Sequence, residues 1–265
     1  LRQLHHPLRL VDCDDVGALA MLHAMADRGE AEILATMVSA PNPWSAPCVD
    51  AVNTYFGRPD LPIGRYVGAI AVTPSKYAQK IAERFPHDTG RGENLPPAAP
   101  LYRTLLLAQP DASVVIVTVG DLSNIAALLQ LPAAGALPSG MDVVKLKVRE
   151  WVCMGGNFIG RPARDDLKLG NNNFTIDKAS SHHAIQHWPA TVPLTFAGRE
   201  IGSGPSGLKA GGRRRELPRT AIVRAAYEYY FGGEPKDRHV ADQTAVLYAV
   251  RGLRDYWDVE ARGRM

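Results

Sequence analysis

Residues 8–20 read LRLVDCDDVGALA, and this stretch decides the fold that we expect for the whole chain. Leu8–Val11 has the composition of a strand end, and Val16–Asp27 has the apolar spacing of an amphipathic helix. The turn between them holds three carboxylates in four residues. These are Asp12, Asp14 and Asp15. A strand, a polar turn and a helix in this order form one unit of a parallel sheet.

The same order recurs downstream of this acidic turn. The predicted strands are Ile33–Val38, Ser113–Val119, Val143–Cys153 and Thr191–Phe196, and the predicted helices include Ala46–Phe56, Leu122–Gln130 and Asp242–Arg251. We therefore predict an α/β fold with an open, mostly parallel sheet flanked by helices, and with residues 1–265 in one domain. In such sheets ligands bind outside the carboxyl ends of the strands. The Gly- and Pro-rich bend Pro86–Pro100 is predicted to be a flexible lid.

The charge balance narrows the classes of partner. The chain has 30 Lys and Arg residues against 27 Asp and Glu residues, so its formal charge is only +3. A surface that tracks nucleic-acid phosphates needs a stronger positive bias, so we expect no nucleic-acid partner. No apolar run is long enough to span a bilayer, so we expect no membrane contact either. The expected partner is a small molecule, and a homo-oligomer is left open.

The three cysteines are far apart and lack metal-site spacing. They are Cys13, Cys48 and Cys153. Neither a disulfide framework nor a zinc site is therefore indicated, and a reducing, cytoplasmic compartment fits best. Because the sequence begins with Leu1 instead of Met, secretion stays an alternative.

The acidic turn has two interpretations on its own. Carboxylates in a first helical turn cap the helix, and each gains about 0.3–1 kcal/mol from the helix dipole. That gain does not obviously compensate three close negative charges, whereas a hard cation such as calcium or magnesium would. A strand-end aspartate also serves phosphohydrolases as a nucleophile, but this chain lacks their downstream lysine and Ser/Thr signature.

Five segments in one order along the chain resemble motifs of the inosine-uridine preferring nucleoside hydrolase superfamily. They are Asp12–Ala20 (DCDDVGALA), Val119–Ala126 (VGDLSNIA), Met154–Gly156 (MGG), Asn171–Asp177 (NNNFTID) and Asp242–Ala245 (DQTA). The ordered set is far more specific than any one segment, and it spans nearly the whole chain. The sequence thus resembles a distant member of that superfamily.

The resemblance implies calcium-dependent hydrolysis of the N-glycosidic bond of ribonucleosides or a related N-riboside. It implies that calcium is held by Asp15, the backbone carbonyl of Val119, and Asp242. It further implies that ribose hydroxyls are bound by polar side chains at the strand ends. These are Asp14, Asn42, Asn157, Asn171 and Asn173.

The chain departs from the family pattern in three ways. The aspartate expected as general base is missing or displaced, and Asp12 is the substitute to consider. The substrate-loop glutamate is matched by Asn171, and the histidine beside the late aspartate is replaced by Ala241. His87 and His239 are the alternatives for the acid that protonates the leaving base. Two further functions follow as alternatives: a catalytically impaired member that binds ribose, and a magnesium-dependent phosphohydrolase.

Overall fold

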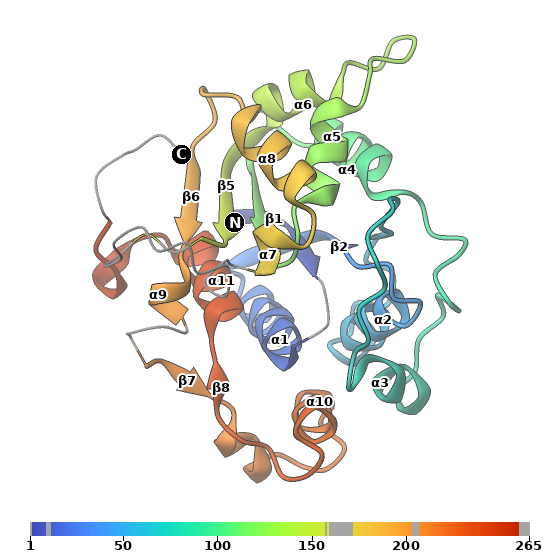
Figure 1. Cartoon of the computed structure of the whole chain (residues 1–265), viewed down its shortest axis with the longest axis vertical. Coiled ribbons are helices and arrows are strands. Elements are labelled where there is room, and N and C mark those ends of the chain that lie inside the picture. Colours follow the sequence, from blue (N-terminus) through green and yellow to red (C-terminus); the bar gives the residue numbers. More distant parts are fainter. Residues whose placement is uncertain (1, 9–11, 157, 159–171, 203–206, 260–265) are drawn as a thin grey trace.

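The computed structural model describes residues 2–8, 12–156, 158, 172–202 and 207–259. Its centre is a sheet of six parallel strands in the order β3-β2-β1-β4-β5-β6 (Figure 1). The strands are β1 (Arg2–Leu8), β2 (Ala31–Val38), β3 (Ile63–Gly64), β4 (Val114–Thr118), β5 (Val148–Met154) and β6 (Leu194–Ala197). The predicted α/β class with an open parallel sheet is confirmed.

Helices cover both faces of this sheet and form two apolar layers. One layer contains α1 (Cys13–Asp27), α2 (Ser45–Tyr55), α3 (Ala78–Arg84), α10 (Ile222–Phe231) and α11 (Ala241–Arg251), and the other contains α4 (Ala98–Leu107), α5 (Ser123–Gln130), α6 (Gly140–Lys147) and α8 (Lys178–Gln186). Strand β4 contributes to both, because successive side chains of a strand point to opposite faces. Val115 and Val117 pack with the first layer, whereas Val114 and Ile116 pack with the second.

The strand order creates a switch point in the middle of the sheet. From β1 the chain builds outward through β2 to β3, and it then returns to place β4 on the other side of β1. The next strands, β5 and β6, continue away from β4. In open α/β sheets the crevice at such a switch point, outside the carboxyl ends of the two central strands, is where ligands bind. The turns that follow β1 and β4 are therefore the turns that matter most.

Short elements complete the described part of the chain. They are α7 (Asn172–Thr175), α9 (Arg199–Gly202), the 3₁₀ turns Gly212–Glu216 and Arg254–Tyr256, and an antiparallel ribbon of β7 (Lys209–Ala210) and β8 (Arg238–His239). Among the helices described, none combines the length and apolar character that a bilayer crossing requires.

One predicted strand is partly wrong. The segment Val143–Cys153 is not extended throughout, because helix α6 runs over Gly140–Lys147 and β5 begins only at Val148. The Ser139 side chain caps this helix by accepting a hydrogen bond from the Asp142 backbone N–H. Basic side chains in its last turn complement the helix dipole. Local capping therefore outweighs the strand preference of the valines.

The bend predicted as a flexible lid is anchored to the body of the protein. The Asp50 carboxylate on α2 accepts hydrogen bonds from the backbone N–H groups of Asp88 (2.8 Å) and Thr89 (3.1 Å). The Arg91 guanidinium lies over the Trp44 ring, 3.7 Å from its centroid. Helix α4 already begins at Ala98. The contacts hold this segment in place instead of leaving it as a free flap.

A buried histidine ties α1 to α2 in the first layer. The Nε2 atom of His23 lies 3.0 Å from Oδ1 of Asn53, and its Nδ1 atom lies 3.3 Å from an Arg58 guanidinium nitrogen. Because arginine can only donate, Nδ1 must accept, and Nε2–H must donate to Asn53. The ring also stacks on Phe56 at 4.9 Å. Burial, followed by the nearby charge of Arg58, lowers the pKa of His23 to about 4, although the hydrogen bond to Asn53 favours the charged form.

This network predicts a specific pH dependence of stability. In the unfolded chain, His23 binds a proton once the pH falls below its ordinary pKa. In the folded chain it stays neutral until the pH falls to about 4. The free energy of unfolding should therefore fall between pH 6.5 and 4, by at most about 3 kcal/mol from this group. Urea denaturation across that range should show a shallower fall for His23→Gln than for the wild type. An identical slope in both proteins would refute the assignment.

Candidate active site

The acidic turn begins helix α1 at the switch point of the sheet. Asp12 is the N-cap, and its Oδ1 atom accepts a hydrogen bond from the Cys13 backbone N–H at 2.8 Å. Asp14 and Asp15 lie in the first turn and are only 2 % and 3 % exposed. The capping interpretation is therefore correct for Asp12 alone. Two further carboxylates, Asp14 and Asp15, are buried beside it, and each disfavours the ionisation of its neighbours.

Helix α11 brings a fourth carboxylate to the same place. Asp242 lies in its first turn and is 6 % exposed. Burial first, and then the charges of Asp14, Asp15 and Asp12, raise the pKa of Asp242 well above its ordinary value. Asp242 therefore lies near the first turn of α1, where the carboxylates oppose one another's ionisation. That Asp15 and Asp242 hold a metal ion together stays a prediction.

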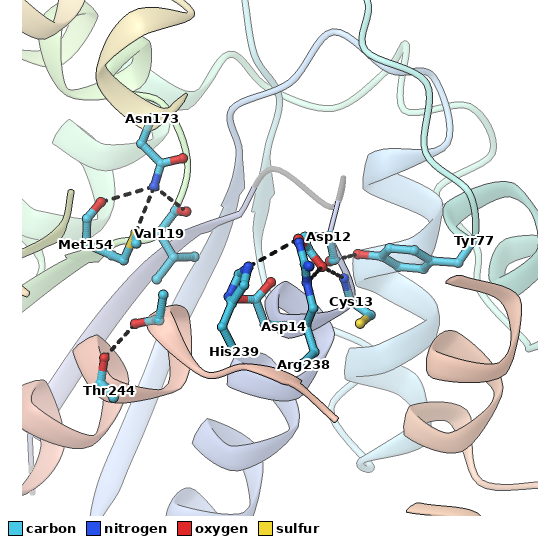
Figure 2. Close-up of polar contacts among 11 residues, drawn as sticks. Asp12, Cys13, Asp14, Tyr77, Val119, Met154, Asn173, Arg238, His239 and Thr244 are labelled. Carbon is cyan, nitrogen blue, oxygen red and sulfur yellow. Dashed lines mark hydrogen bonds and ion pairs between the residues drawn. The ribbon is translucent and has the colours of Figure 1, made fainter. Parts of the chain in front are cut away.

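Strand β8 contributes two basic side chains that face the acidic turn (Figure 2). The Nε atom of Arg238 donates to both carboxylate oxygens of Asp12, at 2.9 and 3.0 Å, and a terminal guanidinium nitrogen also donates to Oδ2. The Nδ1 atom of His239 lies 3.0 Å from Oδ2 of Asp14, and its Nε2 atom lies 3.7 Å from Oδ2 of Asp12. Sequence reasoning selected His239 but missed Arg238.

These contacts separate the two aspartates electrostatically. Burial by itself would raise the pKa of Asp12, but the hydrogen bond and charge of Arg238, together with His239 and the Cys13 N–H, outweigh it and lower that pKa. Burial raises the pKa of Asp14, and the charge of Asp12 adds to this effect, while the contact with His239 opposes it. Asp12 is thus stabilised as a carboxylate, whereas Asp14 is destabilised as one.

Tyr77, the N-cap residue of α3, fixes the backbone of the acidic turn. The Tyr77 hydroxyl donates to the backbone carbonyl of Asp12 at 2.8 Å, and its ring is fully buried (Figure 2). No sequence signal pointed to Tyr77, because 65 residues separate the two partners. The acidic turn is therefore held by two segments that lie far from it in sequence, Tyr77 and β8.

The turn after β4 is joined to the substrate-loop motif. The side-chain amide of Asn173 donates to the backbone carbonyls of Val119 (3.0 Å) and Met154 (3.1 Å), so it links the ends of β4 and β5 (Figure 2). Three of the predicted motifs are thus in direct contact. A carbonyl oxygen has two lone pairs, so the Val119 carbonyl retains one for another ligand.

The remaining predicted residues are distributed differently. The side-chain amide of Asn42 joins two loops: Nδ2 donates to the Thr73 carbonyl of a distant loop at 3.1 Å, and Oδ1 accepts from the nearby Trp44 N–H at 2.9 Å. His87 lies in the segment anchored on α2, and among the described residues it forms no hydrogen bond or ion pair with the acidic turn. Asn157 and Asn171 lie outside the described residues.

Side chains at the acidic turn form two candidate cation-binding groups. One oxygen each of Asp12 and Asp14 and one ring nitrogen of His239 lie within 4.8 Å of one another, although this group differs from the predicted set of Asp15, Val119 and Asp242. Calcium prefers six to eight oxygen ligands. The carboxylates of Asp14, Asp15 and Asp242 are buried near one another, and a divalent ion would offset their mutual repulsion.

No family model matches the chain, and no curated protein matches its sequence. Solved structures match it at low identity. An inosine-guanosine nucleoside hydrolase is 18% identical at a TM-score of 0.70, with 100% of this chain and 85% of that chain covered. The inosine-uridine preferring nucleoside hydrolase from Bacillus anthracis is 15% identical at 0.67, with 95% and 82% covered. The type III effector protein XopQ complexed with adenosine diphosphate ribose is 16% identical at 0.63, with 95% and 81% covered. The chain therefore has the nucleoside hydrolase fold, as the motifs predicted.

A glycine controls how closely α11 approaches the site. Gly202 ends α9, and its carbonyl accepts a hydrogen bond from the Val240 N–H at 2.8 Å. A Cβ atom at Gly202 would lie 2.3 Å from Cα and 2.7 Å from N of Ala241. Backbone atoms cannot move aside as a flexible side chain can, so any larger residue must displace the first turn of α11 together with Asp242.

We therefore expect Gly202→Ala to lower the free energy of unfolding by about 1–3 kcal/mol, as overpacked core positions do. Urea denaturation measures this change. Gly233→Ala is the matched control, because a Cβ atom there meets nothing within 4 Å, and it should change the free energy of unfolding by less than about 0.5 kcal/mol. Equal effects of the two substitutions would contradict the close approach of α9 and α11.

Proposed function

We propose that this protein hydrolyses the N-glycosidic bond of a ribonucleoside or a related N-riboside, with calcium as cofactor. The observation that carries the proposal is the group of buried carboxylates, Asp14, Asp15 and Asp242, at the switch point of a nucleoside hydrolase-like sheet. Cleavage of this bond develops positive, oxocarbenium-like charge on the sugar. A pocket with excess negative charge stabilises that charge as it forms.

Calcium would be held by the carboxylates of Asp15 and Asp242 and by the carbonyl of Val119. When bound, it would offset part of the negative charge of the carboxylates and hold ribose hydroxyls in place. Asp14 and Asn173 flank this position from α1 and α7, and they are the proposed partners of the remaining hydroxyls. Fixing the sugar hydroxyls orients the anomeric carbon toward the attacking water, which removes much of the entropic barrier.

His239 is the proposed acid that protonates the leaving base. Its Nδ1 atom faces Asp14 at 3.0 Å, which fixes the orientation of the ring, and its side chain is 28% exposed, so a ligand can reach it. A base or acid oriented by a carboxylate is a recurrent catalytic arrangement. Among the described residues no ion pair joins His87 to the acidic turn, whereas His239 lies against Asp14 and Asp12, so the geometry favours His239 of the two histidines considered.

Asp12 is not retained as the proposed general base. Its carboxylate is engaged by Arg238, and its pKa is lowered, which makes it a weak proton acceptor. This engagement favours one alternative, a member that binds ribose or nucleosides without turnover. Because the XopQ structure contains adenosine diphosphate ribose, binding measurements on this protein should include that ligand as well as nucleosides. The magnesium phosphohydrolase alternative gains no support from any contact described above.

Release of reducing sugar from inosine, uridine and guanosine tests the proposed function. We expect turnover with added calcium and a loss of turnover with a chelator. Asp242→Asn should lower kcat/KM by roughly 100-fold or more, because it removes a buried charge that stabilises the transition state. Asp111→Asn is the control. Asp111 pairs with Lys147 near the amino end of β4, away from the acidic turn, so this variant should retain full activity. Ribose binding without any turnover would establish the binding alternative instead.

The role of His239 is tested by varying the leaving group. His239→Gln should lower kcat on inosine by roughly 10²–10⁴-fold, since a general acid contributes that much. The same variant should retain nearly wild-type kcat on 4-nitrophenyl riboside, because nitrophenolate departs without protonation. Equal losses on both substrates would assign His239 a structural role.

A further inference from the structure

The Asp12 carboxylate is saturated by groups of the protein itself. Its Oδ1 atom accepts from the Cys13 N–H and from Arg238, and its Oδ2 atom accepts twice from Arg238. The Tyr77 hydroxyl occupies its backbone carbonyl. The three donors from Cys13 and Arg238 engage both carboxylate oxygens, so Asp12 is poorly placed to bind a metal ion as well. Arg238 in turn lies over the Tyr230 ring at 5.4 Å, which fixes the guanidinium from its other side.

Asp14 and Asp242 belong to the same cluster, but no contact of either carboxylate with an arginine is described. Oδ2 of Asp14 lies 3.0 Å from Nδ1 of His239, and Asp242 is buried in the first turn of α11. The cluster therefore divides into two parts. One is the ion pair of Asp12 and Arg238, and the other contains the buried carboxylates for which no contact with Arg238 is described.

From this division we propose that Arg238 is a positioning residue that keeps Asp12 out of the coordination shell of the cation and so limits the calcium affinity of the site. The proposal rests on the proposed function for the presence of calcium. Arginine suits this task because its planar, permanently charged fork grips both oxygens of a carboxylate. A carboxylate beside the site but bound to arginine supplies neither a ligand nor a net charge.

The proposal predicts the sign of each change in calcium affinity. Loss of Arg238 releases Asp12 as an additional charged ligand, and the affinity of a calcium site rises with the charge of its ligands. Loss of Asp12 alone leaves the Arg238 charge uncompensated beside the cation, so binding should weaken. Loss of both removes a neutral pair, so binding should return close to that of the wild type.

Isothermal titration of the chelator-treated protein with calcium chloride measures these affinities directly. We expect Arg238→Gln to bind calcium about tenfold more tightly or better, and Asp12→Asn to bind it about tenfold more weakly. The double variant should lie within about threefold of the wild type, as a coupled pair requires. Arg238→Lys, which keeps the charge, should stay nearer to the wild type than Arg238→Gln does.

A matched control separates displacement of Asp12 from a general loss of positive charge. Arg214 stacks on Tyr227 at 4.0 Å, and its charge reaches Cys13, but no described contact joins it to a carboxylate of the cluster. Arg214→Gln should change the dissociation constant less than about threefold. If Arg214→Gln raised the calcium affinity as much as Arg238→Gln does, the proposal would be overturned.

The outcomes also distinguish this proposal from the proposed function. If the double variant loses most of its affinity, Asp12 is a calcium ligand, and the role assigned to Arg238 is wrong, whatever the activity. If no variant and no wild type binds calcium, both the cofactor and the role of Arg238 are refuted. If calcium binds as expected but nucleosides are not cleaved, Arg238 keeps its role and only the hydrolase activity fails. Thermal denaturation of each variant verifies that it is folded.

Discussion

The site depends on one constraint, the burial of several carboxylates against one another beneath the carboxyl ends of β1 and β4. Buried like charges destabilise a protein unless positive charge meets them. The chain supplies part of that charge through Arg238, which contacts Asp12. Asp14, Asp15 and Asp242 add further buried negative charge, and the His239 ring lies against Asp14. Their arrangement explains why α1, α11 and β8 converge on a single turn.

The class of fold could be predicted from the sequence because local patterns carried it. Strand, polar turn and helix recur with regular spacing, and the turns that follow β1, β4 and β5 bear the chemistry. The error at Val143–Cys153 arose where a helix cap at Ser139 overrode an apolar run that also suits a strand. A cap depends on one side chain, so the apolar pattern alone could not reveal it.

The candidate site was only partly predictable. Motifs that lie in order along the chain selected Asp14, Asp15, Val119, Asn173 and Asp242. They gave no sign of the hydrogen bond that the Asn173 amide donates to the Val119 carbonyl. Arg238 could not be found in this way, because nothing local indicates that a residue of β8 meets one that lies 226 positions earlier. The same separation in sequence explains why the sequence alone leaves Asp12 as a candidate general base. Its partner, and therefore its weak basicity, exists only in the folded chain.

The ribbon of β7 and β8 also limits how this protein can change in evolution. Arg238 contacts Asp12 while its neighbour His239 contacts Asp14, so two consecutive residues deliver two different groups to two different carboxylates. The pairing of Ala210 with Arg238 and of Lys209 with His239 fixes the positions of these two side chains along the ribbon. An insertion or deletion of one residue between Gly232 and Ala241 would shift that register and exchange the faces of the strand. This segment should therefore tolerate substitutions far better than changes in length.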